Sequence, residues 1–186
     1  MLEEAIAAIS AQSRNMNELL ERLLTVSRMD NALPEPRLEE QELHPLLEEI
    51  TRDFTLVAGD REILLEADRT VRFAYDKDLL RQALVIFLDN AVKFTEVHGQ
   101  ITVFGTEDDG CITIGVRDDG IGIAADKLDK IFDRFYKADP ARGEKGYGLG
   151  LSIAARLAQV MGATVMVDSA PEEGSTFALK FPKDKE

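Results

Sequence analysis

The fold is decided by two stretches, Asp118-Asp119-Gly120-Ile121-Gly122-Ile123 and Gly146-Tyr147-Gly148-Leu149-Gly150-Leu151. Glycines allow backbone amides to approach a phosphate closely, and they take positive φ at little cost. The second stretch runs into an amphipathic segment, Ser152 to Met161, which we expect to be a helix. A helix N-terminus adds unpaired N–H groups and a dipole that favours anions. Because the adjacent Asp118 carboxylate can accept a hydrogen bond from a base amino group, the two stretches indicate a nucleotide site.

Three further segments form an ordered series with these stretches. Asn90-Ala91-Val92-Lys93-Phe94 comes first, Ile131 to Tyr136 lies between the two glycine-rich stretches, and Gly174-Ser175-Thr176-Phe177 comes last. The order resembles the N, G1, F, G2 and G3 boxes of the ATP-binding domain of bacterial sensor histidine kinases. That domain has the Bergerat fold of the GHKL superfamily, which includes DNA gyrase, mismatch-repair and heat-shock chaperone ATPases. The resemblance extends from Met1 to about Lys183.

Composition and charge restrict the classes of function. The chain has 186 residues, enough for one well-buried domain with an appendage. Its formal net charge of −13 argues against nucleic acid or an anionic membrane as a partner. It does not argue against ATP, which meets local rather than global charge. No apolar run approaches the roughly 18 residues of a membrane helix, and no signal-peptide pattern opens the chain. The single Cys111 lies in an apolar run and is interpreted as a buried structural residue.

The first 31 residues predict one long helix with an apolar stripe. The stripe has the spacing of three and four that is typical of an amphipathic helix, and it consists of Leu2, Ile6, Ile9, Met16, Leu20 and Leu23. A lone helix in water is marginal, so the stripe must face a partner. One interpretation is packing against the rest of this chain. The other is that residues 1–33 are the second helix of a dimerisation hairpin whose first helix is absent.

The rest of the chain alternates between helical and strand patterns. Residues 34–43, with two prolines and many acids, are interpreted as a linker, and residues 44–186 as the catalytic ATP-binding domain. The expected helices are 44–57, 77–94, with Asp76 as N-cap, and a short one near 126–132, besides the one after Gly150. The expected strands are 63–67, 71–74, 101–106, 111–117, 164–169 and 176–181. This pattern predicts an α+β two-layer sandwich. The resemblance implies a mixed sheet that is covered on one face by three helices.

The first polar group of the expected site is Asn90. Its amide oxygen suits Mg²⁺, which prefers oxygen ligands completed by waters and substrate phosphates, although a buried Asn satisfied by the backbone is the commoner outcome. The resemblance implies that Asn90 is the magnesium ligand that bridges the ion to the triphosphate. Lys93 shares its helix face and can pair with phosphate oxygens, or it is a solvated surface lysine. The resemblance places Phe94 beside the adenine; from the residue alone, Phe94 belongs to the core.

Asp118 is the second such group, at the end of an expected strand. The resemblance implies that its carboxylate accepts a hydrogen bond from the adenine amino group, and that Thr176 supports it. The alternative for Asp118 is turn capping, which is also the role we assign to Asp119. The remaining expected nucleotide-binding residues surround these groups: Gly120, Gly122, Ile123, Tyr136, Lys137, Gly146, Gly148, Leu149, Gly150 and Leu151.

A polar segment, Lys137 to Lys145, is expected to form a mobile lid over the nucleotide. A cation there can contact the β- or γ-phosphate once the lid closes. Lys137 matches a basic position of the family motif, whereas Arg142 is a looser assignment. Arg134 and Lys145 are interpreted as solvated charges.

Ile86 departs from the family pattern. The family has a second Asn one helical turn before the magnesium ligand, and isoleucine can neither ligate a metal nor donate a hydrogen bond. We expect weaker metal affinity or phosphate positioning at this site, but we expect nucleotide binding to survive.

The two histidines lack the context of a phosphoacceptor. In the family, the acceptor histidine lies on the first hairpin helix and is followed by an acidic residue, whereas Pro45 follows His44 and Gly99 follows His98. We therefore expect the acceptor upstream of Met1 and no self-phosphorylation. The resemblance implies three partners or settings: the hairpin and a second kinase protomer, a response-regulator receiver domain, and the cytoplasmic side of an inner-membrane sensor.

The resulting hypothesis is a kinase domain that transfers the ATP γ-phosphate to a histidine outside this chain. Two alternatives stay open. One is a nucleotide-binding regulatory module without phosphotransfer, favoured by Ile86 and the missing acceptor. The other is a serine kinase of the anti-sigma-factor type, against which the hairpin-like first helix argues.

Overall fold

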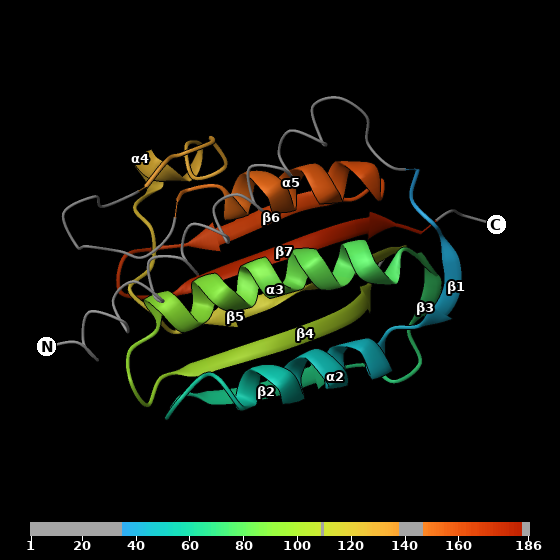
Figure 1. Ribbon diagram of the computed structural model, residues 1–186, viewed down its shortest axis with the longest axis horizontal. Coiled ribbons are helices and arrows are strands. Elements are labelled where there is room, and N and C mark those ends of the chain that lie inside the picture. Colours follow the sequence, from blue (N-terminus) through green and yellow to red (C-terminus); the bar gives the residue numbers. More distant parts are fainter. Residues whose placement is uncertain (1–34, 109, 138–146, 184–186) are drawn as a thin grey trace, which may run out of the picture.

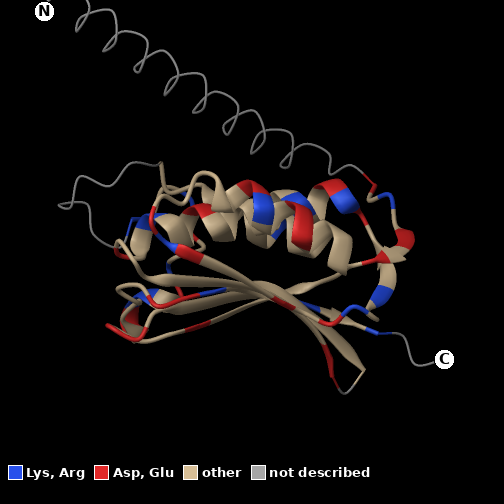
Figure 2. Cartoon of the chain, turned by 90° about the horizontal axis from the view of Figure 1, so that it is seen from below, with Lys and Arg blue, Asp and Glu red and all other residues tan. Residues whose placement is uncertain are grey.

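The computed structural model describes residues 35–108, 110–137 and 147–183 (Figure 1). The expected N-terminal helix, most of the expected lid, including Arg142, and the first glycine of the second glycine-rich stretch, Gly146, lie outside these residues. The described part has two layers, a twisted sheet and a layer of helices on one of its faces (Figure 2). The prediction of an α+β two-layer sandwich is confirmed.

The main sheet has five strands in the order β2-β4-β5-β7-β6. β2 pairs with β4 in parallel, and the other neighbours are antiparallel. The sheet is therefore mixed, as expected. Its strands are β2 (Glu62–Ala67), β4 (Gln100–Asp108), β5 (Cys111–Asp118), β7 (Ser175–Pro182) and β6 (Thr164–Ser169).

Three helices cover one face of this sheet: α2 (His44–Thr55), α3 (Lys77–Phe94) and α5 (Gly150–Val160). α3 begins where predicted, because the Asp76 carboxylate accepts hydrogen bonds from the backbone N–H groups of Asp78 and Leu79, both at 3.0 Å. Its apolar face enters the core, where Leu84, Phe87 and Leu88 are 0% exposed. The ring of Phe87 stacks 5.7 Å from that of Phe177 in β7, which anchors α3 over the centre of the sheet.

The segment interpreted as a linker contains a strand. β1 (Glu39–Glu42) pairs antiparallel with β3 (Arg72–Tyr75) to form a separate two-stranded sheet. The Tyr75 hydroxyl donates to the Glu42 carbonyl at 3.0 Å, and the following Leu43 is fully buried. The linker prediction is wrong here, because backbone pairing with a distant strand and one buried anchor order a segment whose own side chains are mostly acidic.

The short helix before the expected lid is also shorter than predicted. α4 (Ala125–Leu128) gives way to turns, and Phe135 adopts a φ of 64° while its N–H donates to the Gly148 carbonyl at 2.8 Å. After Leu128 the backbone forms tighter turns, in which the N–H of Lys130 donates to the Lys127 carbonyl and that of Asp133 to the Lys130 carbonyl, both at 2.9 Å. Cys111 is half-buried rather than buried, because it alternates with Ile112 and points to the sheet face that the helices leave open.

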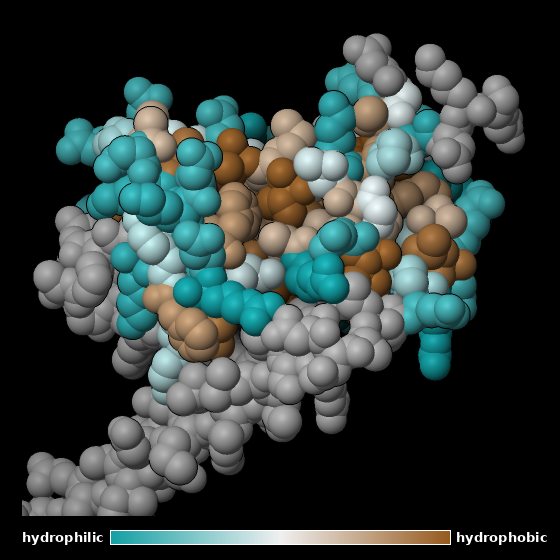
Figure 3. Space-filling view, turned by 90° about the horizontal axis from the view of Figure 1, so that it is seen from above, coloured by the Kyte–Doolittle hydropathy of each residue, from teal (hydrophilic) through white to brown (hydrophobic). Residues whose placement is uncertain are grey.

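The molecule also leaves some apolar side chains exposed. Seen from the side of α5 and β6, hydrophobic residues lie between hydrophilic ones (Figure 3). The edge strand β6 contributes Met166, which is 46% exposed. Within the described residues, no helix has the length and apolarity that a membrane crossing requires.

Candidate functional site

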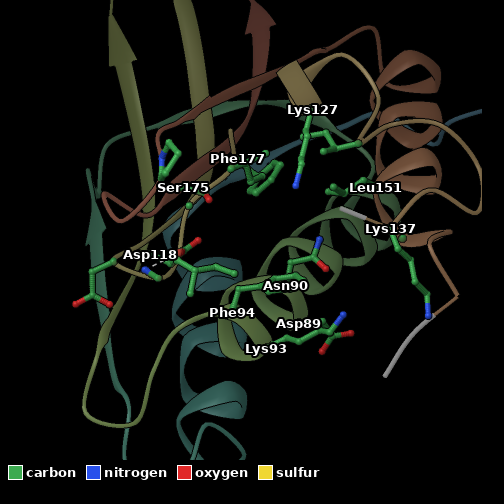
Figure 4. A pocket seen from close by; sticks show the side chains of 18 of the residues that line it. Asp89, Asn90, Lys93, Phe94, Asp118, Lys127, Lys137, Leu151, Ser175 and Phe177 are labelled. Atoms are coloured by element: carbon green, nitrogen blue, oxygen red, sulfur yellow. Dashed lines mark hydrogen bonds between the residues drawn. The ribbon is translucent and has the colours of Figure 1, made fainter. Parts of the chain in front are cut away.

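An open pocket of about 1450 Å³ lies where the C-terminal half of α3, the start of α5 and the loop after β5 meet. Residues from all five motifs line it, although they are up to 91 positions apart, from Ile86 to Phe177. The sheet and α3 therefore bring together the separate segments that the sequence had singled out (Figure 4). We call the part around Asp118 the base end, and the part around Asn90 the phosphate end.

Asp118 dominates the base end. It is the last residue of β5 and is only 7% exposed. Its carboxylate accepts hydrogen bonds from the backbone N–H of Gly120 at 2.9 Å and from the backbone N–H of Ser175. Burial raises the pKa of this carboxyl, and those two hydrogen bonds oppose the rise. The result is a buried, oriented acceptor that faces an open pocket.

Two glycines fix the backbone around Asp118. Gly174 has a φ of 81°, and a Cβ there would lie 1.9 Å from the carbonyl oxygen of Asp118. Gly122 has a φ of 66°, and its Cβ would lie 1.8 Å from the carbonyl oxygen of Ala170. No other residue fits either position without moving backbone, so the loop after β5 is packed directly against the turn that precedes β7.

Asp119 lies beside this turn but has a different role. Its carboxylate accepts a hydrogen bond from the backbone N–H of Gln100 at 2.9 Å, and its own N–H donates to the Gln100 carbonyl. The turn-capping role expected for Asp119 is wrong, because the carboxylate that caps this turn is that of Asp118, which accepts from Gly120 two residues on. Asp119 holds the end of β5 to the start of β4.

The phosphate end is made of long side chains. Asn90 is half-buried near the end of α3, and Lys93 is exposed, with its Nζ 4.5 Å from the centroid of the Phe94 ring. Such a distance is typical of a cation–π contact. Lys127 of α4 and Lys137 extend from other parts of the pocket wall (Figure 4). Amide and ammonium groups of this kind can bind phosphate oxygens and a divalent cation.

The second glycine-rich stretch closes the far wall. Gly148 has a φ of 67°, and a Cβ there would lie 2.5 Å from the Tyr136 carbonyl oxygen, so the backbone of this stretch touches that of residues 135 and 136. α5 begins two residues later, and a Cβ on Gly150 would lie 3.3 Å from Cγ2 of Ile86. The start of α5 therefore packs close to the side chain that replaces the family's second Asn.

A model of the histidine kinase-, DNA gyrase B- and HSP90-like ATPases matches residues 75–185. The chain belongs to this family. The resemblance inferred from the motif order is thereby confirmed. The match covers α3, the main sheet except β2, and the whole candidate site.

Sensor proteins are among the relatives of this ATPase domain. The sensor protein SrrB of Staphylococcus aureus is 32% identical over 186 residues, which is 98% of this chain and 32% of SrrB. The chain thus spans about a third of the length of this relative. The structure of full-length ShkA in complex with AMPPNP matches with a TM-score of 0.85 and 27% identity, over 99% of this chain and 40% of that one. The histidine kinase AdeS of Acinetobacter baumannii, at 19% identity, has a TM-score of 0.79 over 97% of this chain and 84% of its own.

Most residues expected to bind nucleotide line the pocket of this ATPase domain. They are Asn90, Lys93, Phe94, Asp118, Gly120, Gly122, Ile123, Tyr136, Lys137, Gly148, Gly150 and Leu151. Leu149 does not: its side chain is 0% exposed in the core, and its carbonyl accepts from the Ile153 N–H and the Ser152 hydroxyl at the start of α5. Gly146 lies outside the described residues.

Thr176 is a correction. It was expected to support Asp118, but Asp118 pairs with Ser175 in the β5–β7 register, and Thr176 pairs with Arg117. Because successive side chains of a strand point to opposite faces, Thr176 faces away from the pocket and lines a small hollow on the other side of the sheet. The supporting group is the backbone N–H of Ser175. Counting alternate positions back from the buried Phe177 places Ser175, and not Thr176, on the pocket side of β7.

Several pocket residues were not predicted. Lys127, Ser175, Phe177 and His98 all line it. His98 has a φ of 70° in the loop after α3, a conformation that His adopts more readily than most residues. Lys127 carried no motif signal, because α4 is too short for its periodicity to indicate a face.

The donor set fits a metal that is held mainly by the nucleotide. Asn90 offers one amide oxygen to the pocket, and Ile86 one turn earlier offers none. Among the described residues, no group of three His, Cys, Asp or Glu side chains is placed to hold a metal ion. Mg²⁺ usually keeps several waters and binds through one or two protein ligands and substrate phosphates. The site therefore suits Mg²⁺ that arrives with a triphosphate.

Proposed function

We propose that this chain is the ATP-binding catalytic part of a two-component sensor histidine kinase, which transfers the γ-phosphate of MgATP to a histidine outside the chain. The observation that carries the proposal is a single pocket with a buried, oriented carboxylate at one end and an amide with lysines at the other. The family of the chain and the nucleotide analogue named with ShkA support it.

In this proposal the adenine amino group donates to Asp118, and Phe94 lies beside the base. A carboxylate accepts hydrogen bonds only, so it selects a base with an amino group and rejects one that presents a carbonyl. Asn90 contributes one ligand to the magnesium of MgATP. Lys93 and Lys137 neutralise phosphate charge, and the backbone around Gly148 and Gly150 approaches the phosphates.

The chemistry asked of these residues is positioning and charge stabilisation. Phosphoryl transfer requires little covalent participation from the protein. The pocket holds the γ-phosphate for in-line attack by an imidazole and offsets the charge on the transferred group. The attacking nitrogen enters from a separate helix, with the phosphate oxygen of ADP as the leaving group.

Neither histidine of this chain suits the acceptor role. His44 opens α2 beside β1, at the end of the molecule away from α4 (Figure 1). His98 lines the pocket itself, in the loop between α3 and β4, and Gly99 rather than an acidic residue follows it. We therefore assign the acceptor to a dimerisation hairpin, provided by the kinase itself or its second protomer. The next partner in the relay would be a response-regulator receiver domain, on the cytoplasmic side of a membrane sensor.

The test of nucleotide binding is calorimetric titration of AMPPNP, with and without Mg²⁺, on the wild type and Asn90→Ala. Magnesium-dependent binding that is lost in Asn90→Ala supports the site, and we expect a loss of about a hundredfold, since a ligand to a charged group is removed. An absence of binding by the wild type would make the domain a degenerate scaffold.

The test of catalysis is phosphate transfer from radiolabelled ATP to a supplied hairpin that carries the family's acceptor histidine. Acid-labile, base-stable label on the hairpin supports the kinase. Binding of AMPPNP without any transfer supports the regulatory module, which the apolar Ile86 in the pocket favours as the second candidate. Acid-stable label on a serine-bearing antagonist protein would instead indicate the serine kinase.

A further inference from the structure

Of the three lysines that line the pocket in the described part of the chain, Lys127 is the one that no family motif contains. It lies in α4, between the first glycine-rich stretch and the aromatic segment, and it lines the same pocket as Asn90 and Lys137. In Figure 4 its side chain extends from α4 into the pocket, toward the space between Asn90, Leu151 and Phe177.

The local backbone holds Lys127 in place. Its N–H donates to the Ala124 carbonyl at 2.9 Å, and its own carbonyl accepts from the N–H groups of Lys130 and Ile131 at 2.9 and 3.2 Å. Lys127 and Ile131 are four positions apart, and both line the pocket, so they share one face of this turn. Lys127 is half-buried, whereas Asp126, Asp129 and Lys130 around it are exposed. Lys127 therefore points inward because of its place on this turn, and not because the segment is rich in charged residues.

The charge of the pocket makes an inward-pointing lysine at position 127 favourable for binding a polyphosphate. Among the described residues, five carboxylates and only three lysines line it: Asp89, Glu96, Asp118, Asp119 and Glu172 against Lys93, Lys127 and Lys137. Lys93 is exposed and lies over the Phe94 ring. A polyphosphate entering this surplus of negative charge gains from each ammonium group that is already directed inward, because partly buried charges are screened less by salt.

Ile86 gives a second reason. The turn of α3 before Asn90 carries this apolar side chain toward the phosphate end, next to the start of α5. A polar group is thus missing from the α3 wall, and a positive one is present on the α4 wall. We propose that Lys127 binds the phosphate chain of the nucleotide and supplies part of the phosphate positioning that Ile86 does not. This inference rests on the proposed function, since it concerns the same nucleotide.

The test is titration of Mg-AMPPNP and of adenosine into the full chain, with the variants Lys127→Ala, Lys127→Arg and Lys130→Ala. Lys130 is the matched control, because it is exposed on the same turn and its removal changes the net charge equally. We expect Lys127→Ala to raise the Kd for Mg-AMPPNP about tenfold and to leave adenosine within about twofold. Lys130→Ala should change neither ligand, and Lys127→Arg should retain most of the affinity.

The other outcomes are distinct. An equal effect of Lys127→Ala and Lys130→Ala on Mg-AMPPNP would overturn the inference, and so would a loss of adenosine binding in Lys127→Ala, which would indicate a structural role in the pocket wall. If the wild type binds neither ligand, the proposed function itself fails. A second experiment tests the link with Ile86: in an Ile86→Asn background, Lys127→Ala should cost less than in the wild type. If the effects of the two substitutions on the Kd are fully additive, Lys127 does not compensate for Ile86, and that part of the inference is wrong.

Discussion

The two ends of the pocket are built in different ways. At the base end, Asp118 is held by backbone N–H groups and by two turns in which backbone packs against backbone, with Gly122 and Gly174 at the contacts. At the phosphate end, the polar groups are Asn90 and lysines on long flexible stems. The base end is thus fixed by the fold, whereas the phosphate end depends on side chains that can adjust. The base should therefore be recognised by a preformed acceptor, and the phosphates by groups that rearrange on binding.

The strongest way to break this contrast is to disturb the backbone of the base end. Gly174→Ala should lower the free energy of unfolding by about 3 kcal/mol or more, because a Cβ must be accommodated 1.9 Å from the Asp118 carbonyl oxygen at a φ of 81°. Chemical denaturation measures the change.

Gly59→Ala is the matched control for Gly174→Ala. Gly59 has a φ of 65°, but a Cβ there would meet nothing within 4 Å. Only the cost of the left-handed conformation should remain, about 1 kcal/mol. Equal losses in the two variants would mean that the close approach at Gly174 contributes nothing, and the base end would no longer count as backbone-built.

The next effect concerns the acceptor itself. Asp118→Asn should weaken binding of adenosine and of Mg-AMPPNP alike by about a hundredfold, because the amide NH₂ meets the adenine amino group as a second donor. The loss should be the same for both ligands, since it arises at the base end alone. A loss for Mg-AMPPNP only, measured in the same titrations, would show that Asp118 acts through the phosphates instead.

The pKa of Asp118 predicts opposite pH dependences for binding and for stability. Burial raises the pKa of this carboxyl above its unfolded value, so the folded chain binds the proton more readily. Its contribution to stability is therefore largest at low pH and declines as pH rises through the raised pKa. Adenosine prefers the ionised acceptor, so its affinity should fall as pH falls through that same pKa. Both slopes should vanish in Asp118→Asn; a slope that persists belongs to another group.

A substitution at Ile86 tests whether the phosphate end can be improved without a change at the base end. Ile86→Asn restores a polar group one turn before Asn90, and we expect the affinity for Mg-AMPPNP to rise about fivefold while that for adenosine stays constant. Ile86→Val is the control for a change of volume without polarity. A gain in both variants would point to an effect of side-chain volume near the start of α5, where a Cβ on Gly150 would lie 3.3 Å from Cγ2 of Ile86.

Sequence reasoning succeeded where local chemistry determined the structure. Asp76 caps α3 as expected, and Asp118 and Asn90, both singled out by their motifs, line one pocket. It failed where distant pairing decided the outcome. β1 pairs with β3, whose partner residues are 30 to 36 positions further along the chain, and no local pattern in its acidic sequence indicates that partner. Lys127 was missed for the same reason, since only the placement of α4 against the pocket gives its side chain a direction.

A substitution of Thr176 has the smallest expected effect. It tests the β5–β7 register, on which the structure of the base end depends. The motif order assigned Thr176 to the support of Asp118, but the β5–β7 pairing sets Ser175 opposite Asp118 and turns Thr176 to the other face. Thr176→Ala should therefore change adenosine affinity by less than about twofold, as is usual for a substitution outside a site. Ser175→Pro removes the N–H from which the Asp118 carboxylate accepts a hydrogen bond, and it should weaken adenosine binding clearly. A tenfold loss in Thr176→Ala would mean a pairing shifted by one residue, and with it a base end that is not fixed by the backbone around Asp118.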